Sequence, residues 1–141
     1  MKYVLDCSVA LKWVLPELLA DEARQLRDDY RNGVHELLAP DILPAEAAHA
    51  LARAERRKII PVGDAAKLLA DLLTTAPRFI PYQPLLGRAL AVASQMRVGV
   101  YDCLYLALAE RGACEFVTAD DKLIKNLQPQ FPFIISLASL P

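Results

Sequence analysis

The sequence predicts an α/β fold, a three-layer α/β/α domain around a central, mainly parallel sheet. Short apolar runs that suit buried strands alternate along the chain with longer segments of helical spacing, and this alternation is typical of parallel sheets with helices on both faces. The chain has 141 residues, the length of one domain, and 55% of them are hydrophobic, enough for a well-filled core. We therefore expect a single domain over residues 1–141.

The expected strands are short apolar runs. The first run, Tyr-Val-Leu, leads directly into Asp6, Cys7 and Ser8, as suits a buried parallel strand with polar residues at its carboxyl end. Ligand sites in such sheets lie outside the carboxyl ends of the strands. The expected strands span residues 3–5, 37–39, 79–82, 115–118 and 133–135.

Caps and breakers set the expected helix boundaries. Ser8 is expected to cap a helix that Pro16 stops, and Gly33 and Gly112 are expected to end later helices. Pro44 is tolerated because it lies in the first turn of its helix. The expected helices span residues 8–15, 18–32, 42–58, 63–75, 85–96 and 101–111, with a short one after residues 119–121.

Charge and cysteine content limit the function classes. There are 16 basic and 17 acidic side chains, so a general electrostatic grip on nucleic acid is excluded and RNA binding would need a local basic patch. No apolar stretch is long enough to span a membrane, and the N-terminus lacks the pattern of a signal peptide. Three cysteines without a Cys-x-x-Cys pair suit reduced thiols. We therefore expect a cytoplasmic protein.

Four acidic residues fall where a parallel sheet places its ligand site. Asp6 and Asp120 follow the ends of expected strands, while Glu46 and Asp102 lie in the first turns of expected helices. Carboxylates that converge on one cleft repel each other, and a divalent cation relieves that repulsion. Oxygen ligands suit Mg²⁺, or alternatively Mn²⁺, and such an ion can activate water and neutralise a phosphodiester.

Each acidic residue also has a structural interpretation. The helix dipole stabilises acidic residues in a first turn by ~0.3–1 kcal/mol, and this alone could explain the positions of Glu46 and Asp102. Asp120 suits a helix cap or an Asx turn, and Ser8 suits a plain cap. The metal interpretation therefore depends on the four acids occurring together. Zinc is not favoured, because His35 and His49 are not spaced with cysteines and are expected at the surface.

Four segments carry a family resemblance. In their order and spacing they are similar to the PIN-domain nucleases, most closely to the VapC-type toxins of bacterial and archaeal toxin–antitoxin pairs, and they extend over nearly the whole chain. The segments are YVLDCSVALKW at 3–13, PAE at 44–46, YDCLYLALA at 101–109 and FVTADDKL at 116–123.

The resemblance implies an α/β/α PIN-like domain that acts as a Mg²⁺-dependent endoribonuclease and leaves 5′-phosphate and 3′-hydroxyl ends. It implies three partners: RNA as substrate, a VapB-like antitoxin whose C-terminal segment occupies the cleft, and a second copy of this chain. Ser8 and Thr118 would support the site by hydrogen bonds, and Asp121 would substitute or assist. The implied metal and catalytic residues are Asp6, Glu46, Asp102 and Asp120.

The residues that grip RNA are less defined. The densest basic run lies at residues 53–58, where it also suits the negative end of a helix; Lys12, Lys122 and Lys125 lie nearer the acids in sequence. Trp13 is expected in the core or an interface. Cys7 and Cys103 are expected as core fillers beside two of the acids.

Three other functions compete with the nuclease. A phosphate-accepting receiver domain also clusters acids at strand ends, and Asp41 follows an expected strand, but no lysine follows the last strand. A phosphatase with an Asp-x-Asp nucleophile is excluded, because the second aspartate of that motif is replaced by Ser8. A catalytically silent PIN-like domain that binds RNA or protein is the remaining alternative, and retention of all four acids argues against it.

Overall fold

The fold is built around a five-stranded sheet in which every strand pair is parallel. This computed structural model describes residues 1–140. The strand order is β3-β2-β1-β4-β5, so β1 lies at the centre and pairs Val4 with Leu38 of β2 and Phe116 of β4. The strands are β1 (Lys2–Leu5), β2 (Glu36–Pro40), β3 (Arg78–Ile80), β4 (Glu115–Thr118) and β5 (Ile134–Ser136).

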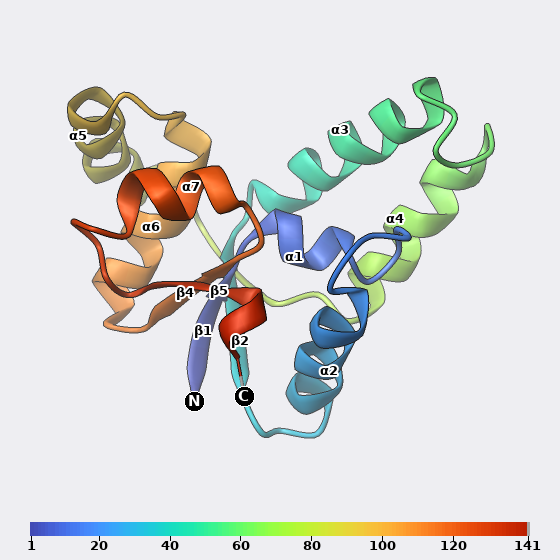
Figure 1. The fold of residues 1–141 in the computed structure, drawn as a ribbon, viewed down its shortest axis with the longest axis horizontal. Helices are drawn as coiled ribbons and strands as arrows, with labels where there is room; N and C mark the ends of the chain where they lie inside the picture. Colours follow the sequence, from blue (N-terminus) through green and yellow to red (C-terminus); the bar gives the residue numbers. More distant parts are fainter. Residues whose placement is uncertain (141) are drawn as a thin grey trace.

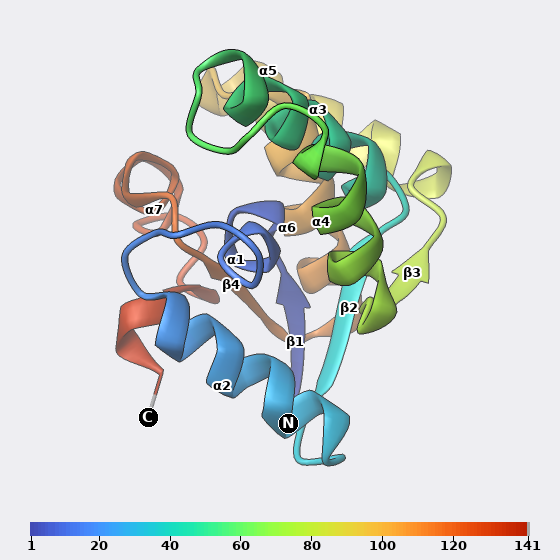
Figure 2. The same cartoon turned by 90° about the vertical axis from the view of Figure 1, so that its right-hand side faces the viewer.

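Helices cover both faces of this sheet, as the alternating sequence pattern predicts. In Figure 1, α5 and α6 lie on one side of the strands, and α1 and α2 lie on the other. Figure 2 views the molecule from the side of α2 and α4. The helices are α1 (Cys7–Leu11), α2 (Ala20–Arg31), α3 (Leu43–Arg56), α4 (Asp64–Thr74), α5 (Leu86–Met96), α6 (Val100–Gly112) and α7 (Asp121–Leu127); short 3₁₀ turns span Gln83–Leu85 and Leu137–Ser139.

Helix α6 is the central helix of the core. Seven consecutive side chains, at positions 103–109, are buried, so α6 is apolar on nearly all sides where it packs against β1, β2 and β4. Its N-cap is Gly99, and Asp102 lies in its first turn. Burial of α6 therefore fixes the position of Asp102 relative to the central strands.

The expected core fillers are confirmed as buried residues. Cys7 and Cys103 are buried free thiols. Trp13 is also buried, and its Nε1 donates a hydrogen bond to the Ala23 carbonyl at 2.9 Å, which joins the segment after α1 to α2. Among residues 1–140, no helix has both the length and the apolar character to cross a membrane.

The start of the first helix differs from the prediction. Helix α1 begins at Cys7 with Asp6 as its N-cap residue, so Ser8 lies inside the first turn and does not cap it. The α-helix also ends at Leu11, although turns continue to Leu15. Elsewhere the differences are small: β3 ends at Ile80 where the prediction runs to 82, and β5 begins one residue later than predicted. Turn chemistry and tertiary contacts, which apolar spacing does not report, set these ends.

Candidate active site

Two of the four predicted acids come together because their strands are neighbours. Asp6 directly follows β1, and Asp120 follows β4 after one intervening residue. Strands β1 and β4 are adjacent and parallel, so their carboxyl ends meet at one edge of the sheet. The Asp6 backbone N–H donates to the Val117 carbonyl at 3.0 Å, which continues the ladder to the site itself.

The Asp6 carboxylate is buried and held by two hydroxyl groups. Only 5% of Asp6 is exposed, and its Oδ2 accepts hydrogen bonds from Ser8 Oγ (2.6 Å) and Thr118 Oγ1 (2.8 Å). The same hydroxyls accept backbone N–H groups, Ser8 from Ala119 and Thr118 from Asp120, both at 3.1 Å. This network ties the end of β1 to the end of β4 and fixes the orientation of the Asp6 carboxylate.

The four acids influence one another electrostatically. Burial raises the pKa of Asp6, against the opposing hydrogen bonds from Ser8 and Thr118, and the charge of Asp120 adds to that rise. Burial, followed by the charges of Asp6 and Asp120, raises the pKa of Asp102 to about 6. Burial also raises the pKa of Glu46, with smaller contributions from the charges of Asp6 and Asp102. The acids therefore form one electrostatic cluster.

Glu46 depends on a residue that the sequence analysis did not select. The Tyr105 hydroxyl donates to Glu46 Oε1 at 2.7 Å. Tyr105 is fully buried, and its ring stacks on Phe116 with centroids 5.9 Å apart. A tyrosine on an apolar helix face is the signal that could have found it, since a buried hydroxyl needs a polar partner.

Asp120 has a structural role as well as a place in the cluster. Its Oδ1 accepts the backbone N–H groups of Lys122 and Leu123, both at 3.1 Å, and so caps α7. The two interpretations of Asp120 are therefore compatible. Asp121 lies in the first turn of α7 and is exposed.

A cavity of about 260 Å³ opens beside Asp102 and Asp120. Arg97, Lys122 and Asn126 also line it. Of these, the sequence analysis had singled out only Lys122. Arg97 and Asn126 are far apart in the chain, and only the packing of α7 near the end of α5 brings them to one cavity.

The basic residues proposed for RNA differ in their surroundings. Lys12 pairs with Glu17 at 3.6 Å. The basic side chains at positions 53 and 56–58 are exposed around the C-terminal end of α3. Lys125 is exposed on α7 and does not line the cavity beside Asp102. Lys122 is therefore the one of the proposed lysines that lines this cavity.

The donor chemistry of the cluster fits a hard divalent cation. Among residues 1–140, none of the four carboxylates has a Lys, Arg or His nitrogen within 4.0 Å, so their charge is not neutralised from within. No three His, Cys, Asp or Glu side chains in that part of the chain form a ready-made cage for an ion. Mg²⁺ does not need one, because it commonly uses one or two carboxylates and takes its other ligands from water and substrate phosphates.

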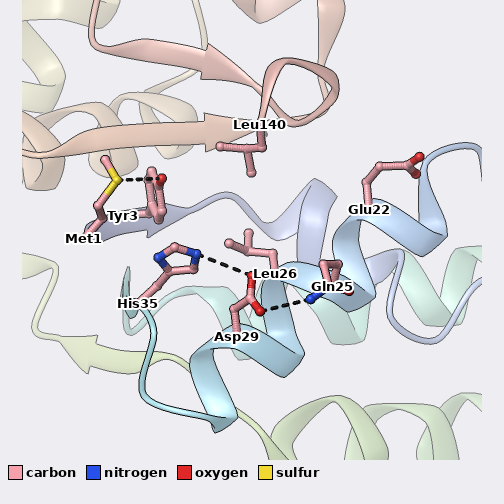
Figure 3. A pocket seen from close by; sticks show the side chains of 8 residues that line it. All are labelled: Met1, Tyr3, Glu22, Gln25, Leu26, Asp29, His35 and Leu140. Carbon is pink, nitrogen blue, oxygen red and sulfur yellow. Dashed lines mark hydrogen bonds and ion pairs between the residues drawn. The ribbon is translucent and has the colours of Figure 1, made fainter.

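A second cavity, of about 250 Å³, lies away from the acids and has a different character (Figure 3). It is lined by residues of β1 and α2 and by His35, just before β2. His35 Nε2 lies 3.5 Å from Asp29 Oδ2, and Gln25 Nε2 donates to Asp29 Oδ1 at 2.9 Å. His49 is exposed as expected, but the expectation for His35 is wrong: it is half-buried against Tyr3, whose ring it meets edge-on at 5.3 Å.

Asp41, the residue that a phosphate-accepting receiver domain would use, has a structural role. Asp41 follows β2, and its Oδ1 accepts the backbone N–H of Tyr82 at 3.0 Å. This contact fastens the turn after β3.

Comparison with known proteins agrees with the fold. The family model described as "PIN domain" matches residues 3–127. Ribonuclease VapC3 of Pyrobaculum aerophilum is 28% identical over 138 residues, which cover 96% of this chain and 99% of that protein. Ribonuclease VapC9 of Mycobacterium tuberculosis is 30% identical over 132 residues, which cover 94% and 96% respectively.

Two crystal structures share the fold at lower identity. PAE2754 from Pyrobaculum aerophilum superposes with a TM-score of 0.69 at 21% identity, covering 99% of this chain and 94% of its own. VapBC2 from Rickettsia felis, bound to a DNA fragment from its promoter, gives 0.63 at 14% identity, with 96% and 97% covered. With a family model that spans most of the chain and VapC relatives that match it nearly end to end, the chain belongs to the PIN-domain family, among its VapC-type members.

Proposed function

We propose that this chain is a Mg²⁺-dependent endoribonuclease, with Mn²⁺ as an alternative ion, that acts as the toxin of a type II toxin–antitoxin pair. One observation supports it above the others: a cluster of four carboxylates at the carboxyl edge of the sheet, of which Asp6 is buried, Glu46 and Asp102 are half-buried and Asp120 is exposed, without a neutralising cation among residues 1–140. The VapC relatives are named ribonucleases, which supports RNA as the substrate.

The proposed roles follow from the contacts of each side chain. Asp6 and Asp102 would hold the ion, and Glu46 and Asp120 would complete the acidic set. The ion, when bound, supplies neutralisation of the phosphodiester charge and lowers the pKa of water. Ser8 and Thr118 are positioning residues, because their hydroxyls fix the buried carboxylate of Asp6.

Tyr105 is proposed as a further positioning residue. Its hydroxyl holds Glu46 Oε1, and its ring is fixed by burial and by stacking on Phe116. Hydrogen-bond partners of this kind orient a metal-binding carboxylate and commonly contribute ~10–100-fold to metal affinity or activity. The proposed acidic set is therefore supported on both sides, by hydroxyls at Asp6 and by a phenol at Glu46.

The proposed protein partners are a VapB-like antitoxin and a second copy of this chain. The neighbouring structure of VapBC2 supports an antitoxin partner. Leu86 and Leu90, one turn apart on α5, and Tyr101 on α6 are large exposed apolar side chains, which supports association with another protein surface. Sedimentation of the purified chain at tens of micromolar tests the dimer; a monomer, with no partner co-purifying from the native host, contradicts it.

RNA cleavage by the purified chain tests the proposed function. We expect cleavage of total RNA with Mg²⁺, none with EDTA, and new ends that carry 5′-phosphates. Binding of RNA without cleavage under either condition would instead support the catalytically silent PIN-like domain. Mapping of 5′-phosphate ends across the transcriptome after induction then identifies the RNA target.

A further inference from the structure

The cavity beside Asp102 and Asp120 also carries positive charge. Arg97 ends α5, Lys122 lies in the first turn of α7, and both line this cavity of about 260 Å³ together with the two carboxylates. Asn126 lies four residues after Lys122, a spacing that places two side chains on one face of a helix. The cavity therefore combines two acids with two cations and an amide.

Neither cation is neutralised by the protein. Arg97 and Lys122 are exposed, and no carboxylate oxygen of residues 1–140 lies within 4.0 Å of either charged group. Asp120 is the adjacent acid, but its Oδ1 accepts the backbone N–H of Lys122 and does not pair with the ammonium group. Both positive charges are therefore available to a ligand that enters the cavity.

Arg97 lies where α5 ends. Its φ of 56° places it in the left-handed region at the C-terminus of α5, as for Lys58 after α3 and Ala113 after α6. This conformation is a common way to end a helix. The sequence has an arginine here, which sets a guanidinium at the edge of the cavity.

The cavity volume indicates the size of a suitable ligand. At about 260 Å³ it is close to the ~300 Å³ at which small-molecule pockets begin, so a phosphate with part of one nucleotide is of suitable size. Cations bind phosphate oxygens without regard to sequence, whereas an amide can hydrogen bond to a base or a ribose hydroxyl. An ion at the acidic cluster neutralises only the phosphate that it contacts, so the adjacent phosphate of an RNA strand requires other cations.

We propose that Arg97 and Lys122 form a subsite for the phosphate adjacent to the one that is hydrolysed, with Asn126 contacting the attached nucleotide of a single-stranded RNA. This subsite rests on the proposed ribonuclease function and names the residues that hold its substrate. It also places two exposed cations next to the acids in a chain whose net charge is −1.

Binding of a short, fluorescein-labelled single-stranded RNA of mixed sequence tests the subsite. Anisotropy is measured in EDTA over a range of salt concentrations. We expect Lys122→Gln and Arg97→Asn each to weaken binding about three- to tenfold at low salt and to lower the slope of log K against log salt by about 0.7. Asparagine is chosen at position 97 because it tolerates the left-handed backbone.

Lys125→Gln is the matched control. It removes the same charge from the same helix at an exposed residue outside the cavity, so affinity and salt slope should stay near those of wild type. Lys122→Arg should preserve the slope. Thermal melts establish that each variant is folded; if Lys122→Gln does not fold, Lys122→Met replaces it in the same assay.

The outcomes separate the subsite from the nuclease. If Lys122→Gln and Lys125→Gln have equal RNA affinity and salt slope, and the wild-type protein cleaves RNA, the subsite is overturned and the proposed function stands. If only Lys122→Gln weakens RNA binding, and the wild-type protein does not cleave RNA, the subsite is supported and the nuclease function is overturned.

Discussion

The two cavities differ in the partners of their acids. Beside the second cavity, the half-buried carboxylate of Asp29 lies 3.5 Å from His35 Nε2 and accepts a hydrogen bond from Gln25 (Figure 3). Beside the carboxyl ends of β1 and β4, Asp6 and Asp102 have raised pKa values and no cation within 4.0 Å among residues 1–140. The two cavities therefore have similar volumes, but Asp29 beside one has a basic partner, whereas Asp6 and Asp102 have none within 4.0 Å among residues 1–140.

This difference is the reason that we propose a function for the cavity beside Asp102 and Asp120. An acid that is desolvated and repelled by neighbouring acids destabilises the folded chain, and clusters of such groups concentrate at functional sites. An acid that is paired within the protein serves the fold, as at Asp29. Cavity size alone does not separate the two, whereas the partners of the acids do.

The largest expected effect is on RNA cleavage. Asp102→Asn should lower cleavage by more than about a hundredfold, beyond the ~10–100-fold cost of losing a supporting hydrogen-bond partner, because it removes a proposed metal ligand. Expression of the wild type should arrest growth, and the variant should relieve that arrest. Asp29→Asn is the control at the second cavity and should cleave RNA like wild type. Equal cleavage by the two variants contradicts the assignment of the active site.

The next largest expected effect is on metal affinity, and it should differ between two buried tyrosines. Tyr105→Phe removes the hydrogen bond to Glu46 and should weaken Mn²⁺ binding, measured by calorimetry, by ~10–100-fold. Tyr3→Phe lies at the other cavity, where the hydroxyl donates only to Met1 Sδ at 3.4 Å, and should leave Mn²⁺ affinity unchanged. If both variants bind Mn²⁺ like wild type, Tyr105 does not position a ligand.

Stability without metal gives a third test, and its sign is informative. The pKa of Asp102 is raised from 3.8 to about 6, so its stabilising contribution is present below pH 3.8 and lost as pH rises through about 6. In EDTA at pH 7.5, Asp102→Asn should melt higher than wild type, and the difference should vanish near pH 3.5. A purely helix-stabilising Asp102 predicts a loss of ~0.3–1 kcal/mol instead.

Addition of Mg²⁺ should reverse that order. Binding to the folded state alone stabilises wild type by about 2.7 kcal/mol at a hundred times Kd, and Asp102→Asn should gain much less. Thermal melts with EDTA and with excess Mg²⁺ give both comparisons. A variant that is less stable in EDTA and equally stabilised by Mg²⁺ would show that Asp102 is structural.

The smallest expected effect is at the second cavity, beside Asp29. Asp29→Asn removes a partly exposed partner of His35, so we expect a loss of only ~0.2–1 kcal/mol in the free energy of unfolding by urea. The change should be the same with EDTA and with Mg²⁺. A Mg²⁺-dependent change would connect this cavity to the metal site.

The amino-acid sequence could predict most of the fold because periodicity reports burial directly. The apolar run before Asp6 and the buried length of α6 are patterns that local sequence contains, and both lie where they were expected. The predicted start of α1 was wrong because the Ser8 hydroxyl, which donates to the nearby Asp6, also accepts from Ala119, a partner that is distant in sequence. Local cap preferences cannot report such a contact.

The sequence by itself determined the α/β class, the parallel sheet and the four acids at strand and helix ends, because these depend on residue type and spacing along one segment. Tertiary structure decided what surrounds those acids. It brought Tyr105 to Glu46, placed Arg97 and Asn126 in the cavity with Asp102, and left Lys125 outside it. The physical reason is that hydrogen-bond partners and local charge depend on how α5, α6 and α7 pack against the sheet, and no single segment contains that information.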